Sequence, residues 1–95
     1  MLYTVRRSPY HDDVNAMLAL VSETDDVLLI QNGVLFGIND NRYLAELMRT
    51  GAGIYALQED LDARGLIEQI SDRVKVIDYD GFVSLTVKHQ QNFAW

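Results

Sequence analysis

The residues of this chain that could carry out chemistry are few. The sequence contains no cysteine, which excludes a thiol nucleophile, a persulfide carrier and a thiolate metal ligand. His11-Asp12-Asp13 combines residue types that bind metals, but adjacent residues of a helix point in different directions and no second ligand motif exists. We expect a solvated first helical turn there, whose acidic side chains complement the helix dipole. His89, the other histidine, is expected near the end of a helix, so no metal site is predicted.

Two further patterns resemble parts of active sites. Gly51-Ala52-Gly53 resembles a phosphate-binding loop, but it follows an expected helix and precedes an expected strand, which is the reverse of the dinucleotide-binding order. No serine stands in a Gly-x-Ser-x-Gly context. The paired carboxylates, Asp60 with Asp62 and Asp78 with Asp80, have no recognisable site around them. We therefore predict no catalytic residue, no cofactor and no enzymatic activity.

Arg6-Arg7 is the one basic doublet. It follows the first expected strand, and open α/β sheets bind ligands at the carboxyl edge of their strands. One alternative function is therefore a small-molecule or nucleotide site near Arg6, Gln31 and Gly33, although a glycine-rich phosphate loop is missing. The plainer alternative for the doublet is an ion pair with the acidic surface.

The elements that would position these residues alternate between strand and helix. Extended segments are expected at 2–6, 27–30, 54–57, 74–77 and 93–95, with a short helical turn at 34–38. Helices are expected from Ser8-Pro9 through Val21, from Asp40 or Asn41 through Met48, over 59–64 with Gly65 as a left-handed cap, and from an Asp80 cap to about His89. This order predicts a single α/β domain over residues 1–95, with a mostly parallel sheet of four to five strands and helices on both faces.

The composition limits the kinds of partner and the cellular compartment that we expect for this protein. The net charge of −6 disfavours direct nucleic-acid binding, which depends on clustered Lys and Arg. The apolar runs are too short to span a membrane, and the N-terminal residues lack the order of a signal peptide. Because small secreted domains usually carry disulfides, we expect a cytoplasmic protein.

The last expected helix carries more apolar residues than one stripe needs, and the terminus adds two aromatic residues. The candidate subunit interface consists of Phe82, Val83, Leu85, Val87, Phe93 and Trp95. The alternative is that a small domain wraps deeply around this helix.

Motifs along almost the whole chain resemble the DsrH-like family of bacterial sulfur-relay subunits, which includes the TusB proteins. They are Arg7-Ser8-Pro9, Leu28-Leu29 with Gln31 and Gly33-Val34, Asn41-Arg42-Tyr43-Leu44, Tyr55-Ala56-Leu57, Glu59-Asp60-Leu61, Ala63-Arg64-Gly65-Leu66, Ile77-Asp78-Tyr79, Phe82-Val83, Leu85-Thr86-Val87-Lys88-His89 and Ala94-Trp95.

The resemblance implies a non-catalytic structural subunit of a heterohexamer, a dimer of heterotrimers with TusC-like and TusD-like subunits. That complex passes persulfide sulfur from TusA-like to TusE-like carriers for 2-thiolation of the wobble uridine of tRNA. The acceptor cysteine belongs to the TusD-like subunit. Some DsrH proteins have a cysteine of their own, and this chain departs from them by having none. A carboxylate-based independent enzyme is a further alternative.

Overall fold

Five short strands form where apolar and β-branched residues are concentrated, and they join in one sheet. The computed structural model describes residues 1–10 and 14–95. The sheet order is β4-β3-β2-β1-β5, and every pairing is parallel. The strands are β1 (Leu2–Val5), β2 (Asp26–Leu29), β3 (Gly53–Leu57), β4 (Lys75–Ile77) and β5 (Asn92–Ala94). The predicted α/β class with a parallel sheet is confirmed.

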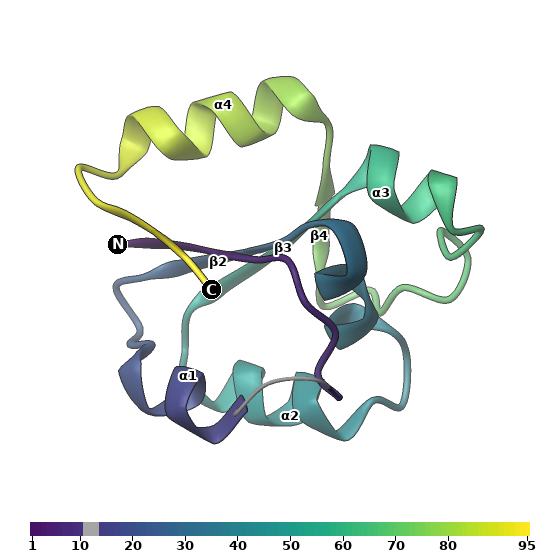
Figure 1. Ribbon diagram of the computed structural model, residues 1–95, viewed down its shortest axis with the longest axis horizontal. Coiled ribbons are helices and arrows are strands. Elements are labelled where there is room, and N and C mark those ends of the chain that lie inside the picture. The colour runs from purple at the N-terminus through teal and green to yellow at the C-terminus, as the bar shows by residue number, and fades with distance from the viewer. Residues whose placement is uncertain (11–13) are drawn as a thin grey trace.

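Helices cover both faces of this sheet (Figure 1). They are α1 (Val14–Leu20), the 3-10 helix η1 (Gln31–Gly37), α2 (Arg42–Arg49), α3 (Gln58–Ala63) and α4 (Tyr79–Lys88). Parallel crossovers are almost always right-handed. Because β1 to β4 follow one another in one direction, their connections place α1 and α2 on the same face. The step from β4 back to β5 reverses the direction, so α4 covers the opposite face alone.

The larger core lies between the sheet and α1 and α2. Strand residues that point to this side, such as Val5, Val27 and Ala56, are fully buried against Met17 of α1 and Leu47 of α2. Leu61 of α3 belongs to the same cluster. These side chains alternate along each strand with those of the other face, as the pleat requires.

The smaller core lies under α4. Its buried members are Leu2, Leu28, Ile30 and Leu85. Leu85 is the only buried residue among the ten residues of α4. The helix is thus attached to the sheet by a narrow inner stripe, and much of its surface remains available.

Two glycines hold backbone positions that other residues could not. A Cβ atom at Gly33 would collide with the carbonyl oxygen of Val5, so glycine permits η1 to pass directly over the end of β1. Gly65 has φ +65°, as expected for the residue that ends α3 in the left-handed region.

Helix starts agree with the expectations in part. Asn41 caps α2 by accepting a hydrogen bond from the Tyr43 N–H at 2.8 Å. The expectation that Asp80 caps α4 is wrong: Asp78 is the cap and accepts from the Gly81 N–H at 3.0 Å, while Asp80 lies in the first turn. The loop before the helix is therefore two residues shorter than expected.

The first helix also begins later than expected. Pro9 and Tyr10 lie in a turn, in which the Tyr10 N–H donates to Ser8 Oγ at 3.3 Å, and α1 is described from Val14. Ser8 thus caps a turn instead of the helix. The His11-Asp12-Asp13 segment lies outside the described residues.

Candidate functional site

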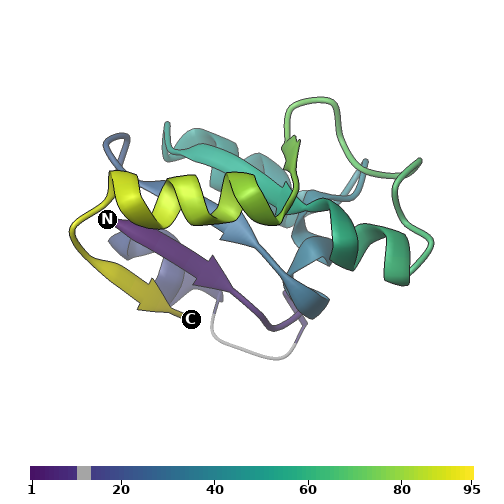
Figure 2. The same cartoon turned by 90° about the horizontal axis from the view of Figure 1, so that it is seen from above.

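The outer face of α4 is a continuous, largely apolar stripe. It consists of Tyr79, Phe82, Val83, Thr86 and Val87. Each of them has another member three or four residues away, so they lie on one side of the helix. Figure 2 shows α4 lying across the sheet, with α3 near its N-terminal end, where the Tyr79 N–H donates to Glu59 Oε2 at 3.0 Å. This stripe, called here the α4 outer face, is the first candidate functional surface.

Exposure separates this face from the inner stripe. Tyr79, Val83 and Val87 are 62%, 43% and 80% exposed, whereas Leu85 is only 7% exposed. Four residues of the outer face, Tyr79, Phe82, Val83 and Thr86, line a shallow cavity of about 120 Å³. The face therefore offers apolar area together with a small depression that could accept a partner side chain.

The Thr86 hydroxyl of this face is satisfied within the helix. The Thr86 hydroxyl donates to the Val83 carbonyl oxygen at 2.7 Å. The rings of Tyr79 and Phe82 pack edge to face with their centroids 6.0 Å apart. Covering the face would thus remove mainly apolar surface from water, and the Tyr79 hydroxyl is the polar group that a partner would have to satisfy.

A buried carboxylate fixes the far end of α4 to the sheet. Asp26, at the start of β2, accepts hydrogen bonds from His89 Nε2 at 2.7 Å and from Lys88 Nζ at 3.0 Å. Burial would raise the pKa of Asp26, but the hydrogen bonds from His89 and Lys88, and their positive charges, outweigh it and hold this pKa below its usual value. The same contact raises the pKa of Lys88. This arrangement orients the helix on the sheet.

The terminal aromatic residues lie on the other face of the sheet. Phe93 is opposite Tyr3 in the register of β5 and β1, with the two ring centroids 5.9 Å apart. Phe93 is 44% exposed and packs beside Trp95, which is partly buried against the larger core. Phe93 and Trp95, called here the edge patch, thus form a second apolar area at the β5 edge of the sheet.

The six residues of the sequence-based interface are therefore divided among three places. Phe82, Val83 and Val87 lie on the α4 outer face, Leu85 points into the smaller core, and Phe93 and Trp95 form the edge patch. Sequence reasoning missed Tyr79. Its spacing of three, four and eight residues from Phe82, Val83 and Val87 would have identified it.

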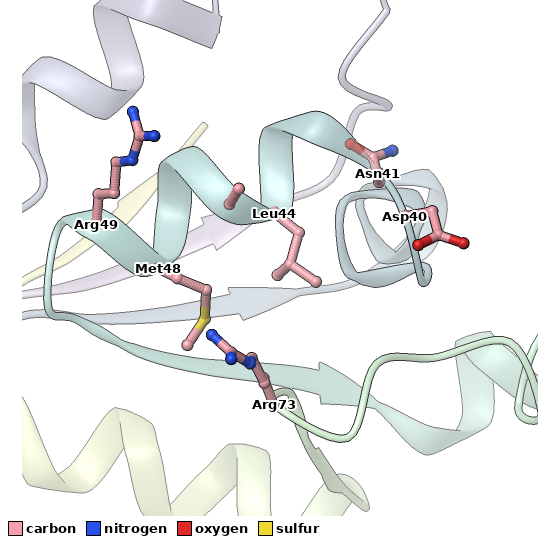
Figure 3. Close-up of a pocket in the computed structure, with 7 residues that line it drawn as sticks. Asp40, Asn41, Leu44, Met48, Arg49 and Arg73 are labelled. Atoms are coloured by element: carbon pink, nitrogen blue, oxygen red, sulfur yellow. The ribbon is translucent and has the colours of Figure 1, made fainter.

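A cavity of about 520 Å³ lies beside α2. Leu44 and Met48 point toward it, Arg73 approaches from the segment before β4, and Arg49 turns away (Figure 3). Asp40 and Asn41 are at the other end. Its lining is mixed, and it includes none of the residues singled out from the sequence as an interface.

A smaller, polar cavity of about 310 Å³ occupies the carboxyl edge of the sheet. It is lined by Arg6, Arg7, Ser8, Gln31 and Asn32. The structure thus brings together Arg6 and Gln31, two of the three residues on which the ligand-binding alternative rests. Gly33 instead lies buried over the end of β1.

Neither metal binding nor membrane spanning has support in the part of the chain that the structure describes. Residues 1–10 and 14–95 contain no group of three or more acidic or histidine side chains placed to hold a metal ion. The longest helix described, α4, has ten residues, about half of what a bilayer crossing needs.

Curated relatives resemble this chain over its whole length. It is 59% identical to Protein TusB of Photorhabdus laumondii, 50% identical to Protein TusB of Cronobacter sakazakii and 46% identical to Protein TusB of Yersinia pestis. Each comparison spans 95 residues and covers 100% of both proteins.

Solved structures show the same fold. The crystal structure of the YchN protein from E. coli has a TM-score of 0.77 at 16% identity, covering 99% of this chain and 97% of that one. The solution structure of Tm0979 from Thermotoga maritima has a TM-score of 0.68 at 26% identity, covering 96% and 97%. Residues 7–92 match the family described as DsrH like protein. Since that match and the full-length identities include nearly every residue, this chain belongs to the DsrH-like family.

Proposed function

We propose that this chain is a non-catalytic structural subunit of a bacterial sulfur-relay complex. Its full-length identity to proteins named TusB supports a role in the relay that serves 2-thiolation of the wobble uridine of tRNA. The proposal includes TusC-like and TusD-like partners, assembly as a dimer of heterotrimers, and a cytoplasmic location. The chain acts as one domain that holds its partners in place.

The α4 outer face carries this proposal. Full burial of an apolar side chain contributes roughly 1.5–3 kcal/mol, so covering Tyr79, Val83 and Val87 would supply several kcal/mol toward association. Aromatic residues at the centre of a buried surface often dominate binding energy. Tyr79 with its neighbour Phe82 is suited to that role, and the 120 Å³ depression beside them can accept a partner side chain.

A subunit in a complex of three different proteins can have more than one neighbour. The α4 outer face and the edge patch lie on opposite faces of the sheet and are separated by it. We assign the α4 outer face to the first partner contact. The edge patch, with Phe93 exposed beside Tyr3, is the proposed second contact.

The non-catalytic role rests on the chemistry of sulfur transfer. The thiolate is the species that attacks and carries sulfur, and this chain has no cysteine. In the proposed relay, sulfur from a TusA-like donor reaches the cysteine of the TusD-like subunit and then a TusE-like acceptor. The present chain contributes to that path by assembly.

The test is co-expression of the chain with TusC-like and TusD-like subunits, followed by affinity purification and size-exclusion chromatography. Val87→Asp should reduce recovery of the partners at least tenfold, because a buried unpaired charge opposes association. Ser84→Asp is the matched control, since Ser84 is exposed on the same helix but outside the stripe. Both variants should keep the wild-type circular dichroism spectrum.

Equal recovery of partners with Val87→Asp and with wild type would remove the α4 outer face from the proposal. If Phe93→Asp alone then abolished recovery, the contact would belong to the edge patch. Loss of helical signal in Val87→Asp would contradict the described exposure of this residue.

A further inference from the structure

Two segments that follow neighbouring strands meet at the carboxyl edge of the sheet. Val5 and Leu29 are paired in the register of β1 and β2, so the chain leaves both strands at the same level. Arg6, Arg7 and Ser8 follow β1, and Gln31 and Asn32 follow β2. Together these five residues line the 310 Å³ cavity. Open α/β sheets bind ligands at this position.

Every lining residue carries a hydrogen-bond donor in its side chain. Two guanidinium groups, two amides and one hydroxyl surround the space, and no carboxylate is among the described residues that line it. The Ser8 hydroxyl accepts from the Tyr10 N–H, which leaves its own proton to donate. Such a set of donors suits a ligand that is negatively charged and consists mainly of acceptors.

The carboxylate of Asp60, beside Gln31, is already engaged. Asp60 Oδ2 accepts from the Gln31 N–H at 2.7 Å, and Asp60 Oδ1 is 3.6 Å from Arg64 Nη1. The Arg64 Nε also donates to Asn32 Oδ1 at 3.2 Å. The hydrogen bond from the Gln31 N–H accompanies the left-handed φ of 50° at this residue. Arg6 has no ion pair with any residue that the structure describes.

We propose that this cavity binds a small tetrahedral oxyanion, such as phosphate or sulfate, with Arg6 as the principal cation. The anion is either a free inorganic ion or the phosphate of a small nucleotide, because both present the same acceptor geometry to these donors. A nucleic-acid strand is disfavoured by the net charge of −6. The site is independent of the proposed subunit contacts, because it uses none of the residues of the α4 outer face or the edge patch.

The test is isothermal titration calorimetry of the full chain with inorganic phosphate, sulfate and adenosine monophosphate. Sodium chloride keeps the ionic strength constant, and a chloride titration provides the blank. Wild type should bind phosphate saturably, and Arg6→Gln should weaken binding about tenfold, which corresponds to the loss of one charge-assisted hydrogen bond. Arg6→Lys, which retains the charge, should weaken it less. Arg49→Gln, which changes an exposed arginine of α2, should bind like wild type.

Amide chemical shifts locate the ligand. Phosphate should shift the Ser8, Gln31 and Asn32 resonances in wild type and leave them unchanged in Arg6→Gln. Tighter binding of the nucleotide through the same residues would identify a nucleotide phosphate as the ligand, and equal affinity would identify the free anion. A linear, unsaturable response, or the same loss of affinity in Arg49→Gln as in Arg6→Gln, would overturn the proposal. Failure of partner assembly would leave these measurements unaffected.

Discussion

The carboxylate of Asp26 and the imidazole of His89 are 2.7 Å apart, although 63 residues separate them in sequence. Their hydrogen bond joins the start of β2 to the end of α4. Lys88 Nζ binds the same oxygen at 3.0 Å. Because Leu85 is the only buried residue of α4, this polar contact is a further attachment that helps to hold the helix, and with it the α4 outer face, in place.

Asp26→Asn should therefore destabilise the fold. Asparagine keeps the size of the side chain but removes the charge from a residue that is 6% exposed. A hydrogen bond to a charged group contributes about 1.5–3 kcal/mol, and the largely exposed Lys88 contributes little of it. We expect a loss of about 2 kcal/mol in the free energy of unfolding, measured by urea denaturation. Asp72→Asn, an exposed control, should change it by less than about 0.5 kcal/mol; equal losses in both variants would contradict the role of Asp26.

The Asp26 carboxylate also predicts how the stability of the fold changes with pH. The folded-state pKa of Asp26 lies below that of an unfolded aspartate, which is about 3.9. The unfolded chain therefore binds the proton first as pH falls, so stability from this group is present at neutral pH and is lost below about pH 4. Urea denaturation at several pH values should show a shallower acid decline in Asp26→Asn than in wild type. Identical slopes would show that Asp26 is not the group responsible.

Gly33 and Gly65 should respond differently to alanine. A methyl group at Gly33 meets the Val5 carbonyl oxygen and forces η1 away from β1, so we expect a loss of about 3 kcal/mol or more. At Gly65 there is no atom within 4 Å of the added methyl group, and only the positive φ opposes alanine, which costs roughly 1 kcal/mol. Thermal denaturation of both variants checks this order. A larger loss at Gly65 would be inconsistent with the described packing.

The isolated chain should accept no sulfur. Incubation with a cysteine desulfurase and sulfur-labelled cysteine should leave no covalent label after gel filtration, because no thiol is present to form a persulfide. A TusD-like subunit treated in parallel serves as the positive control. Stable label on this chain would mean that another side chain carries sulfur, and the non-catalytic role would be wrong.

The strands and most helices could be predicted from sequence because their signals are local. Val27–Leu29 is a continuous apolar run, typical of a parallel strand covered on both faces. Asn41 and Gly65 have the residue types that helix ends favour. The start of α4 could not be fixed in this way, since Asp78 and Asp80 are equally suitable caps. The choice depends on where β4 ends, which its pairing with β3 determines.

The candidate interface could likewise be predicted only in part from the sequence. The spacing of Phe82, Val83 and Val87 predicts one helical face, and they do lie together on α4. Phe93 and Trp95 could not be placed, because their position depends on β5 pairing with β1 at the far edge of the sheet. No local pattern indicates that this pairing puts them on the opposite face from α4. The polar cavity likewise depends on two strand ends that are distant in sequence.

Native mass spectrometry of the chain co-expressed with TusC-like and TusD-like subunits is the decisive test of the proposed assembly. We expect one complex that contains two copies of each of the three subunits. The chain made alone should self-associate at high concentration, because the α4 outer face is then uncovered. A chain that remains monomeric and soluble at high concentration, and that is absent from any complex with the co-expressed subunits, would contradict the account.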